Sequence, residues 1–178
     1  MKAITIMGKH NIDKMNELEN VAYQAIRKHM TDFDDVLYDT AKQIVLLREM
    51  NEEYTPLKEY AQLDIKSLLQ KELEHKIQGY KGQDIKKVIH QEATLINLEA
   101  LLAKLCESKL ECFYCTKPVL VLYKNVREPS QWTLDRLDNS LSHTSTNTCI
   151  ACLKCNLQRR IMNTEKFTFT KRLKINKV

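Results

Sequence analysis

The sequence predicts an α+β protein that is mainly helical, with a helical bundle over residues 1–108 and a zinc-stabilised ββα unit over residues 109–178. Three observations support this prediction. The 178-residue chain contains only 3 Gly and 3 Pro, which is typical of long helices. In the first region, apolar residues recur at steps of three and four, the period of an amphipathic helix. In the second region, two C-x-x-C pairs have a spacing typical of metal ligands.

Charge separates the same two regions. Residues 109–178 contain 13 Lys or Arg against 5 Asp or Glu, whereas residues 1–108 carry a net charge of −3. A basic region of this kind favours a polyanionic partner such as nucleic acid. No apolar run approaches the ~18 residues of a membrane-spanning helix, and the first residues lack the apolar stretch of a secretion signal. We therefore expect an intracellular protein, in the cytoplasm or nucleus, that is neither secreted nor bound to a membrane.

Four amphipathic helices are expected in residues 1–108. Their apolar stripes are Met15, Leu18, Ala22, Ala25 and Ile26; Leu37, Ala41, Ile44 and Val45; Ile65, Leu68, Leu69, Leu73 and Ile77; and Val88, Leu95, Leu98, Leu102 and Leu105. Thr31 or Asp32 can cap the second helix, Thr55-Pro56 can begin the third, and Gly79 can end it. The fourth is expected over residues 84–106. Its near-heptad spacing makes it the candidate surface for a homodimer or another protein partner.

The two cysteine pairs predict a structural zinc site. Cys112 and Cys115 form one pair, and Cys152 and Cys155 form the other. Four thiolates make the tetrahedral ligand set that structural zinc prefers, and disulfides are rare in a reducing compartment. We interpret Cys106 and Cys149 as packing residues. A competing pair made of Cys149 and Cys152 remains open.

The residues between the pairs predict a hairpin and a helix. Residues 119–123 (VLVLY) are rich in β-formers, a turn segment follows, and residues 131–134 (QWTL) form a second β-rich run. A polar loop over residues 138–147 then leads to a helix that carries the second cysteine pair and Asn156. Zinc would hold the hairpin and the helix together as a ββα unit.

The segment WTLDRLDNSLSHTSTNTCIACLKCN, residues 132–156, resembles the motif of HNH endonucleases, the ββα-metal or His-Me finger family. It is most similar to the branch with LDR-x-DN that includes relatives of phage recombination endonuclease VII and proteins of large DNA viruses. The resemblance covers about residues 109–163. It implies an HNH-like domain that hydrolyses phosphodiester bonds in DNA with one catalytic divalent ion, Mg²⁺ or Mn²⁺.

The resemblance also implies roles for individual residues. Asp135 and Asn156 would supply oxygen ligands to the catalytic ion, and Asn147 would tie the loop through backbone hydrogen bonds. The common motif has a histidine base directly after the aspartate, whereas this chain has Arg136, which cannot accept a proton. Arg136 could instead hold a phosphate or stabilise developing negative charge. His143 is either the general base or a loop-packing residue, and both interpretations stay open.

Basic residues around and after the expected helix favour contact with nucleic-acid phosphates. They are Lys154, Arg159, Arg160, Lys171, Arg172 and Lys174. Two functions remain open: a metal-dependent HNH-type endonuclease, and a catalytically silent zinc-stabilised nucleic-acid-binding protein on the same fold. The presence of both Asp135 and Asn156 favours the enzyme, and Arg136 favours the binding protein. The sequence leans toward the enzyme.

Overall fold

The structure is a computed structural model that describes residues 26–27, 34–54 and 65–173. The expected helix before Ile26, the caps at Thr31 or Asp32 and the start at Thr55-Pro56 lie outside the described residues. In chain order, the elements are the 3₁₀ helix η2 (Asp35–Tyr38), α2 (Thr40–Glu52), α3 (Ile65–Lys86), the 3₁₀ helix η3 (Glu92–Thr94), α4 (Leu98–Glu107), β1 (Trp132–Arg136), β2 (Thr148–Cys152), α5 (Leu153–Arg159) and α6 (Thr164–Arg172).

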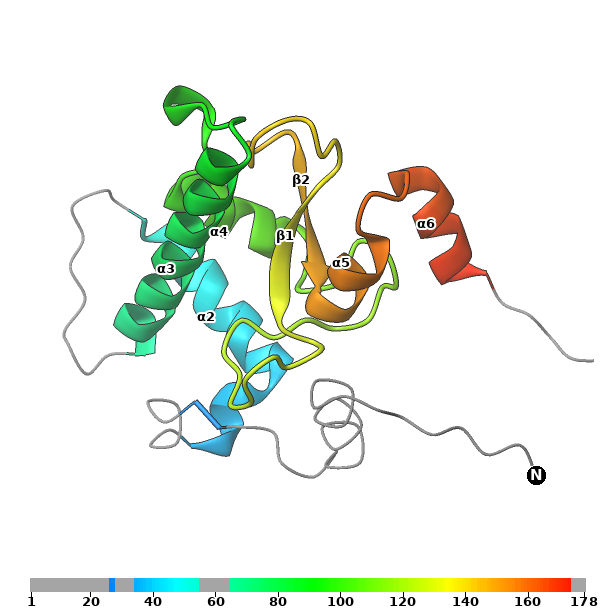
Figure 1. The fold of residues 1–178 in the computed structure, drawn as a ribbon. Helices are drawn as coiled ribbons and strands as arrows, with labels where there is room; N and C mark the ends of the chain where they lie inside the picture. Colours follow the sequence, from blue (N-terminus) through cyan, green and yellow to red (C-terminus); the bar gives the residue numbers. More distant parts are fainter. Residues whose placement is uncertain (1–25, 28–33, 55–64, 174–178) are drawn as a thin grey trace, which may run out of the picture.

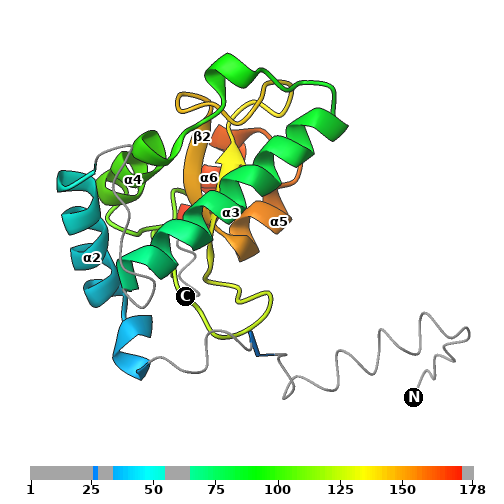
Figure 2. The same ribbon diagram turned by 90° about the vertical axis from the view of Figure 1, so that its left-hand side faces the viewer.

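The fold is α+β, with a two-stranded antiparallel sheet between helices. Helices α2, α3 and α4 lie on one side of β1 and β2, and α5 and α6 lie on the other (Figure 1). Turned by 90°, the molecule shows α3 crossing in front of the strands (Figure 2). Helix α5 begins at the residue after β2 ends, so the two strands and the helix form one continuous unit.

Every residue of both strands is buried. In the antiparallel register Trp132 lies opposite Cys152, and Arg136 lies opposite Thr148. Because helices cover both faces of the sheet, neither face alternates between core and solvent. The polar side chains of β1 must therefore find partners inside the protein.

The hairpin does not join the segments that the sequence suggested. The expected strand over residues 119–123 is absent from the described structure, and only an isolated parallel bridge links Leu120 to Gln131. The expected second strand corresponds to β1, but its partner is β2. Both segments are rich in β-formers, so their composition could not show which pair of segments would join.

Gln43 of α2 explains why residues 119–123 need no strand partner. Its fully buried side chain accepts hydrogen bonds from the backbone N–H of Val121 at 2.7 Å and of Leu122 at 3.1 Å. Its amide group donates to the carbonyl oxygen of Leu122 at 3.0 Å. One side chain thus satisfies three backbone groups that a neighbouring strand would otherwise pair.

Helix α3 carries the expected stripe but is longer than expected. Leu69, Leu73 and Ile77 are buried, as the periodicity predicted. The expected stop at Gly79 is wrong, because the helix continues through Gly79 and Gly82 to Lys86. A glycine inside a helix costs only about 1 kcal/mol, which the packing of the stripe offsets.

The actual end of α3 is a left-handed residue without a glycine. Val88 has φ 57°, and its N–H donates to the carbonyl oxygen of Ile85 at 3.0 Å. The N–H of Ile89 donates to the carbonyl oxygen of Asp84 at 3.0 Å. These two bonds form a Schellman motif, which satisfies the last carbonyl groups of the helix.

The expected fourth helix over residues 84–106 is two separate elements. Residues 84–86 belong to α3, and α4 begins only at Leu98, where Asn97 accepts a hydrogen bond from the Ala100 N–H at 2.9 Å. Leu102 and Leu105 are buried in the core, whereas Val88 is 91% exposed. The near-heptad stripe is therefore not one helical surface, and most of it is covered within the chain.

Helix α2 turns a different face inward from the one expected. Gln43, Leu47 and Met50 are buried, whereas Ala41 and Val45 are exposed. Asp39 is the N-cap of the helix, and its side chain accepts a hydrogen bond from the Lys42 N–H at 3.1 Å. A buried glutamine on the inner face is a pattern that a search for apolar stripes misses.

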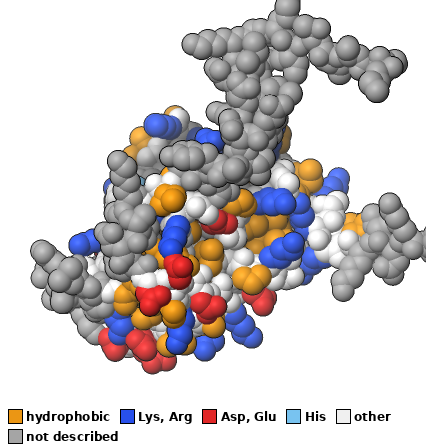
Figure 3. Space-filling model, turned by 90° about the horizontal axis from the view of Figure 1, so that it is seen from below, with side chains coloured by type: hydrophobic (Ala, Val, Ile, Leu, Met, Phe, Trp, Pro, Cys, Tyr) orange, Lys and Arg blue, Asp and Glu red, His pale blue; other side chains and the backbone are white. Residues whose placement is uncertain are grey.

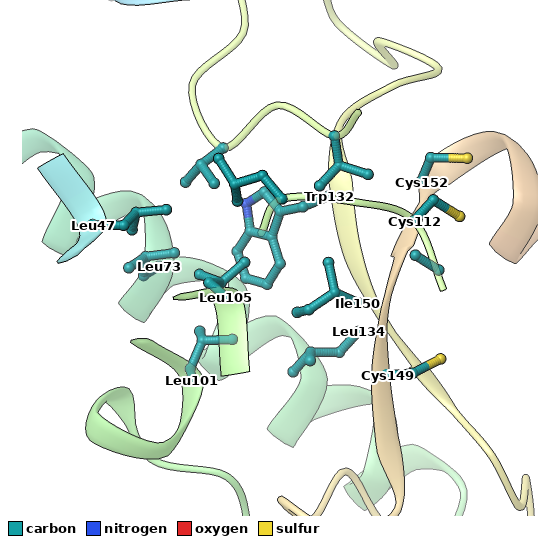
Figure 4. Packing of buried hydrophobic residues seen from close by; sticks show 14 of the residues in the cluster. Leu47, Leu73, Leu101, Leu105, Cys112, Trp132, Leu134, Cys149, Ile150 and Cys152 are labelled. Carbon is teal, nitrogen blue, oxygen red and sulfur yellow. The ribbon is translucent and has the colours of Figure 1, made fainter. Parts of the chain in front are cut away.

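One buried apolar cluster joins the helices to the sheet. The indole of Trp132, which is fully buried, lies between leucines of α2, α3 and α4 and the side chains of Leu134 and Ile150 (Figure 4). In the same view, the side chains of Cys112 and Cys152 direct their sulfur atoms away from the indole (Figure 4). The cluster includes residues on both sides of the expected boundary at 108/109, and that boundary stays a prediction.

Charge is unevenly spread over the face seen from below. Most acidic side chains lie at the lower left of this view, with basic side chains among them, and further basic side chains lie among apolar ones at the right (Figure 3). None of the helices in the described ranges combines the length and apolar character needed to cross a bilayer.

Candidate functional site

The two cysteine pairs come together in one cluster. Cys112, Cys115, Cys152 and Cys155 place their sulfur atoms all within 4.8 Å of one another. The first pair sits on a turn closed by the Thr116 N–H, which donates to the carbonyl oxygen of Cys112 at 2.9 Å. The second pair joins the end of β2 to the first turn of α5, where the Cys155 N–H donates to the Sγ of Cys152 at 3.4 Å.

This cluster suits a metal ion such as zinc. Four thiolates around tetrahedral zinc lie about 3.8 Å apart, given Zn–S bonds of about 2.3 Å. The hydrogen bond between Cys112 and Cys152 lowers the pKa of Cys112 to about 4 and raises that of Cys152. The lowered pKa of Cys112 favours its thiolate, which is the form that binds zinc.

The remaining cysteines lie apart from the four-cysteine cluster. Cys149 is buried, with its Sγ 3.7 Å from the hydroxyl oxygen of Tyr114, and burial raises the pKa of Cys149 to about 12. Cys106 is half-buried beside the core. Neither belongs to the set of sulfur atoms that could share an ion. The four clustered cysteines are the ones that the C-x-x-C spacing predicted.

A cavity of about 630 Å³ lies between α3 and α5, and we call it the α3–α5 cavity. Its lining includes the motif residues Asp135, Arg136, His143 and Asn156 together with Arg160, and it also includes Tyr80, Lys76 and Lys87 from the α3 side. The sequence assigned no chemistry to residues 1–108. Helix α3 nevertheless forms one wall of the cavity that the motif residues line.

His143 is buried and paired with Asp84 of α3. The Nδ1 of His143 lies 2.7 Å from Oδ1 of Asp84, and the His143 backbone N–H donates to Oδ2 of Asp84 at 2.8 Å. Asp84 is fully buried. Burial is the main cause that lowers the pKa of His143, and Asp84 opposes it. His143 is therefore neutral near pH 7, although its partner is a carboxylate.

Arg136 is also buried and contacts the same carboxylate. Its Nη1 lies 3.6 Å from Oδ1 of Asp84 and donates to the carbonyl oxygen of Leu141 at 3.2 Å. These contacts hold the loop that carries His143 against α3. Arg136 supplies positive charge to the cavity wall, but it cannot act as a proton acceptor.

Asp135 has partners for both carboxylate oxygens. Arg159 donates from Nε to Oδ2 at 2.5 Å and from Nη2 to Oδ1 at 2.9 Å. The Tyr114 hydroxyl donates to Oδ2 at 2.7 Å. Arg159, predicted as a phosphate contact, is 2% exposed and is instead the charge partner of Asp135.

The two asparagines of the motif make different contacts. Asn147 binds the loop backbone: its Nδ2 donates to the carbonyl oxygens of Asp138 at 2.9 Å and Ser142 at 3.0 Å, and its Oδ1 accepts from the Asp138 N–H at 3.0 Å. Asn156 of α5 donates from Nδ2 to the Thr133 hydroxyl at 3.0 Å. Its Oδ1 accepts no hydrogen bond from the described residues.

As arranged, Asp135 and Asn156 do not suit a hard divalent cation. Mg²⁺ requires an octahedron of oxygen ligands. Asn156 offers one amide oxygen, but the charge of Asp135 is already balanced by Arg159. An ion at this position would compete with a buried guanidinium.

The predicted phosphate-binding cations lie in different settings. Lys154 and Arg160 are exposed, and Arg160 lines the α3–α5 cavity. On α6, Lys171 donates to Gln158, and Arg172 donates to the carbonyl oxygen of Phe113 at 2.6 Å. Lys174 lies outside the described residues.

Lys76 of α3 was not predicted. Its ammonium lies 4.4 Å from the centre of the Trp132 ring and donates to the Trp132 carbonyl oxygen at 2.5 Å. Burial lowers the pKa of Lys76 to about 7.

The fold and the site together define a mainly helical α+β protein with a four-cysteine cluster that could hold a metal ion such as zinc. Comparisons with protein-family models, with curated proteins and with solved structures gave no match to this chain.

Proposed function

We propose that the chain is an HNH-type endonuclease that hydrolyses phosphodiester bonds in DNA at the α3–α5 cavity. The observation that carries this proposal is the imidazole of His143, which is paired with a buried carboxylate in a cavity lined by cations. A neutral imidazole can accept a proton from water. The cations can hold the phosphate and stabilise its developing negative charge.

The reaction requires two proton transfers and one displacement at phosphorus. Nε2 of His143 takes a proton from water, and the water oxygen forms a bond to phosphorus. The ester P–O bond breaks, and the leaving oxygen takes a proton from solvent water. Arg136 and Arg160 lie in the same cavity as His143, so the site pairs a base with fixed positive charge.

The four-cysteine cluster has a structural role in this proposal. A metal ion bound by the four cysteines would hold the turn at Cys112 against the junction of β2 and α5, the helix that carries Asn156. Zinc with four thiolate ligands has no open position for water, so it would not activate a nucleophile. The requirement for a second, catalytic ion follows only from the resemblance to HNH enzymes.

A second function, nucleic-acid binding without cleavage, is favoured by the ion pair between Asp135 and Arg159. Arg159 donates to both oxygens of Asp135, the carboxylate that an HNH enzyme would use to bind its catalytic ion. In this alternative the cavity and the exposed cations Lys154 and Arg160 bind phosphates, and the zinc-stabilised unit is a scaffold.

A plasmid-nicking assay separates the two functions. Zinc-loaded protein is incubated with supercoiled DNA in Mg²⁺, in Mn²⁺ and in a chelator, and the zinc content of each sample is measured afterwards. Cleavage that His143→Ala reduces about a hundredfold or more supports the enzyme. Tight DNA binding without cleavage in either ion, across duplex, branched and single-stranded substrates, supports the binding protein. Ser145→Ala, an exposed change in the same loop, is the matched control.

A further inference from the structure

Two residues of α3, one turn apart, hold His143 in position. Asp84 accepts hydrogen bonds from both the backbone N–H and the ring of His143, at 2.8 and 2.7 Å. The ring of Tyr80 lies against the imidazole, with the ring centres 4.7 Å apart and the planes at 30°. Tyr80 is itself held, because its hydroxyl oxygen accepts the Leu134 N–H at 2.8 Å. Both the position and the plane of the imidazole are therefore set by α3.

The contact with Asp84 also determines which ring nitrogen carries the proton. A carboxylate only accepts hydrogen bonds, so Nδ1 of His143 must be the donor. In a neutral imidazole the other nitrogen, Nε2, then has a free lone pair. Within the described residues Nε2 makes no hydrogen bond, and His143 lines the α3–α5 cavity.

The surroundings keep this imidazole neutral. The charged and titratable groups around it are Asp84, Arg136, Lys87 and Tyr80. Burial, Arg136 and Lys87 each lower the pKa of His143, and only Asp84 raises it. Asp84 thus makes Nε2 a better proton acceptor without letting the ring become an imidazolium at neutral pH.

We propose that Asp84 is a positioning residue that fixes His143 in the Nδ1–H tautomer and presents Nε2 to the cavity as the proton acceptor. The catalytic meaning of this arrangement rests on the proposed endonuclease function. The tautomer itself does not. Helix α3, outside the motif, therefore supplies part of the site.

The tautomer is tested by long-range ¹H–¹⁵N NMR spectra of the full-length, zinc-loaded protein between pH 5 and 8.5. In the wild type, the ¹⁵N shifts at pH 7.5 should show a protonated Nδ1 and an unprotonated Nε2 on His143. Asp84→Asn should lower the pKa of His143 and populate the Nε2–H tautomer, because the asparagine amide can donate to Nδ1. An Nε2–H tautomer in the wild type overturns the proposal, whatever the variant does.

A matched control lies on the surface of the same chain. Glu92 pairs with Nε2 of His90 at 2.8 Å, which is also a contact between a carboxylate and an imidazole. Glu92→Gln should leave the His143 signals unchanged. Spectra in which Glu92→Gln and Asp84→Asn alter His143 equally would overturn the assignment to Asp84.

Kinetics then separate this inference from the proposed function. In a cleaving wild type, Asp84→Asn should lower kcat at least about tenfold, leave KM near its original value and move the acidic limb of the pH profile to lower pH. A cleaving wild type whose pH profile does not change in Asp84→Asn overturns the positioning role and leaves the nuclease standing. A wild type that cuts nothing but carries the Nδ1–H tautomer overturns the nuclease and leaves the positioning of His143 standing.

Discussion

Arg159 holds the carboxylate of Asp135 through two hydrogen bonds inside the protein, from Nε to Oδ2 at 2.5 Å and from Nη2 to Oδ1 at 2.9 Å. The same guanidinium donates from Nη2 to the carbonyl oxygen of Arg136 at 2.5 Å and from Nη1 to that of Met162 at 2.9 Å. The hydrogen bond to Asp135 is the main cause that raises the pKa of Arg159. The pair links β1 to α5, and Tyr114 links it to the turn of the first cysteine pair.

Asp135→Ala should lower the free energy of unfolding by about 3–5 kcal/mol, because it leaves the Arg159 charge buried without a partner. Urea unfolding of zinc-loaded protein measures this change. The double variant Asp135→Leu with Arg159→Met should regain most of the loss. An Asp135→Ala protein as stable as the wild type would mean that the carboxylate is not held in the pair and is available to an ion.

Zinc content should depend on four cysteines only. Cys152→Ser should lose the metal, because three thiolates and a hydroxyl make a much poorer set for zinc. Cys149→Ser, three residues away, should retain one ion per chain, as measured by mass spectrometry of the intact protein and by elemental analysis. Loss of zinc from Cys149→Ser would show that Cys149 belongs to the ligand set.

The free energy of unfolding should rise with pH between about 7 and 10, because the pKa of Lys76 is lowered to about 7 in the folded protein. The unfolded chain binds this proton up to its ordinary pKa near 10.4, so falling pH favours unfolding across that window. Lys76→Met should flatten this dependence, measured by urea unfolding at pH 7, 8.5 and 10. Lys71→Met, on an exposed position of the same helix, should leave the dependence unchanged.

Nucleic-acid binding should depend on cations that line the α3–α5 cavity. Arg160→Gln and Lys87→Gln should each reduce the slope of log K against log salt by about 0.9, the value for one lost phosphate contact. The slope is measured by fluorescence anisotropy with a labelled oligonucleotide, at salt concentrations from about 50 to about 300 mM. Lys42→Gln, on the exposed face of α2, is the control. A change as large in Lys42→Gln would place the interface elsewhere.

Val88→Gly should stabilise the protein by about 1–2 kcal/mol. Val88 is β-branched, has φ 57° and is 91% exposed, so glycine relieves a strained backbone and loses almost no packing. Thermal unfolding measures the gain. Val45→Gly, an exposed valine inside α2, should instead destabilise, because there the backbone is helical. A lower melting temperature for Val88→Gly would contradict the prediction.

The sequence predicted features that depend on local spacing. The C-x-x-C pairs predicted the four-cysteine cluster because two cysteines three residues apart can reach one ion. The stripe of Leu69, Leu73 and Ile77 gave the inner face of α3 because one helix repeats every 3.6 residues. Within each cysteine pair and along the α3 stripe, the residues that act together are close in the chain.

Features that depend on distant partners could not be predicted. Asp84 became part of the site only because α3 packs beside the loop of His143, 59 residues later. The sequence does not predict the strand partner of β1, because Gln43, 78 residues earlier, pairs with the backbone of Val121 and Leu122. Gly79 predicts a helix stop because glycine is common at helix ends, although here the packing beyond it continues the helix. In these cases tertiary contacts overrode the local preference.

The buried amide of Gln43 sets an order of events during synthesis. Its partners, Val121 and Leu122, follow it by 78 and 79 residues. At translation rates of about 5–20 residues per second, those backbone groups are synthesised roughly 4–16 s after Gln43. Until then the Gln43 side chain has only water and the carbonyl oxygen of Leu37, to which its Nε2 donates at 2.8 Å, as partners. Helix α2 therefore completes its packing only after Val121 and Leu122, and the cysteine turn that precedes them, have been synthesised.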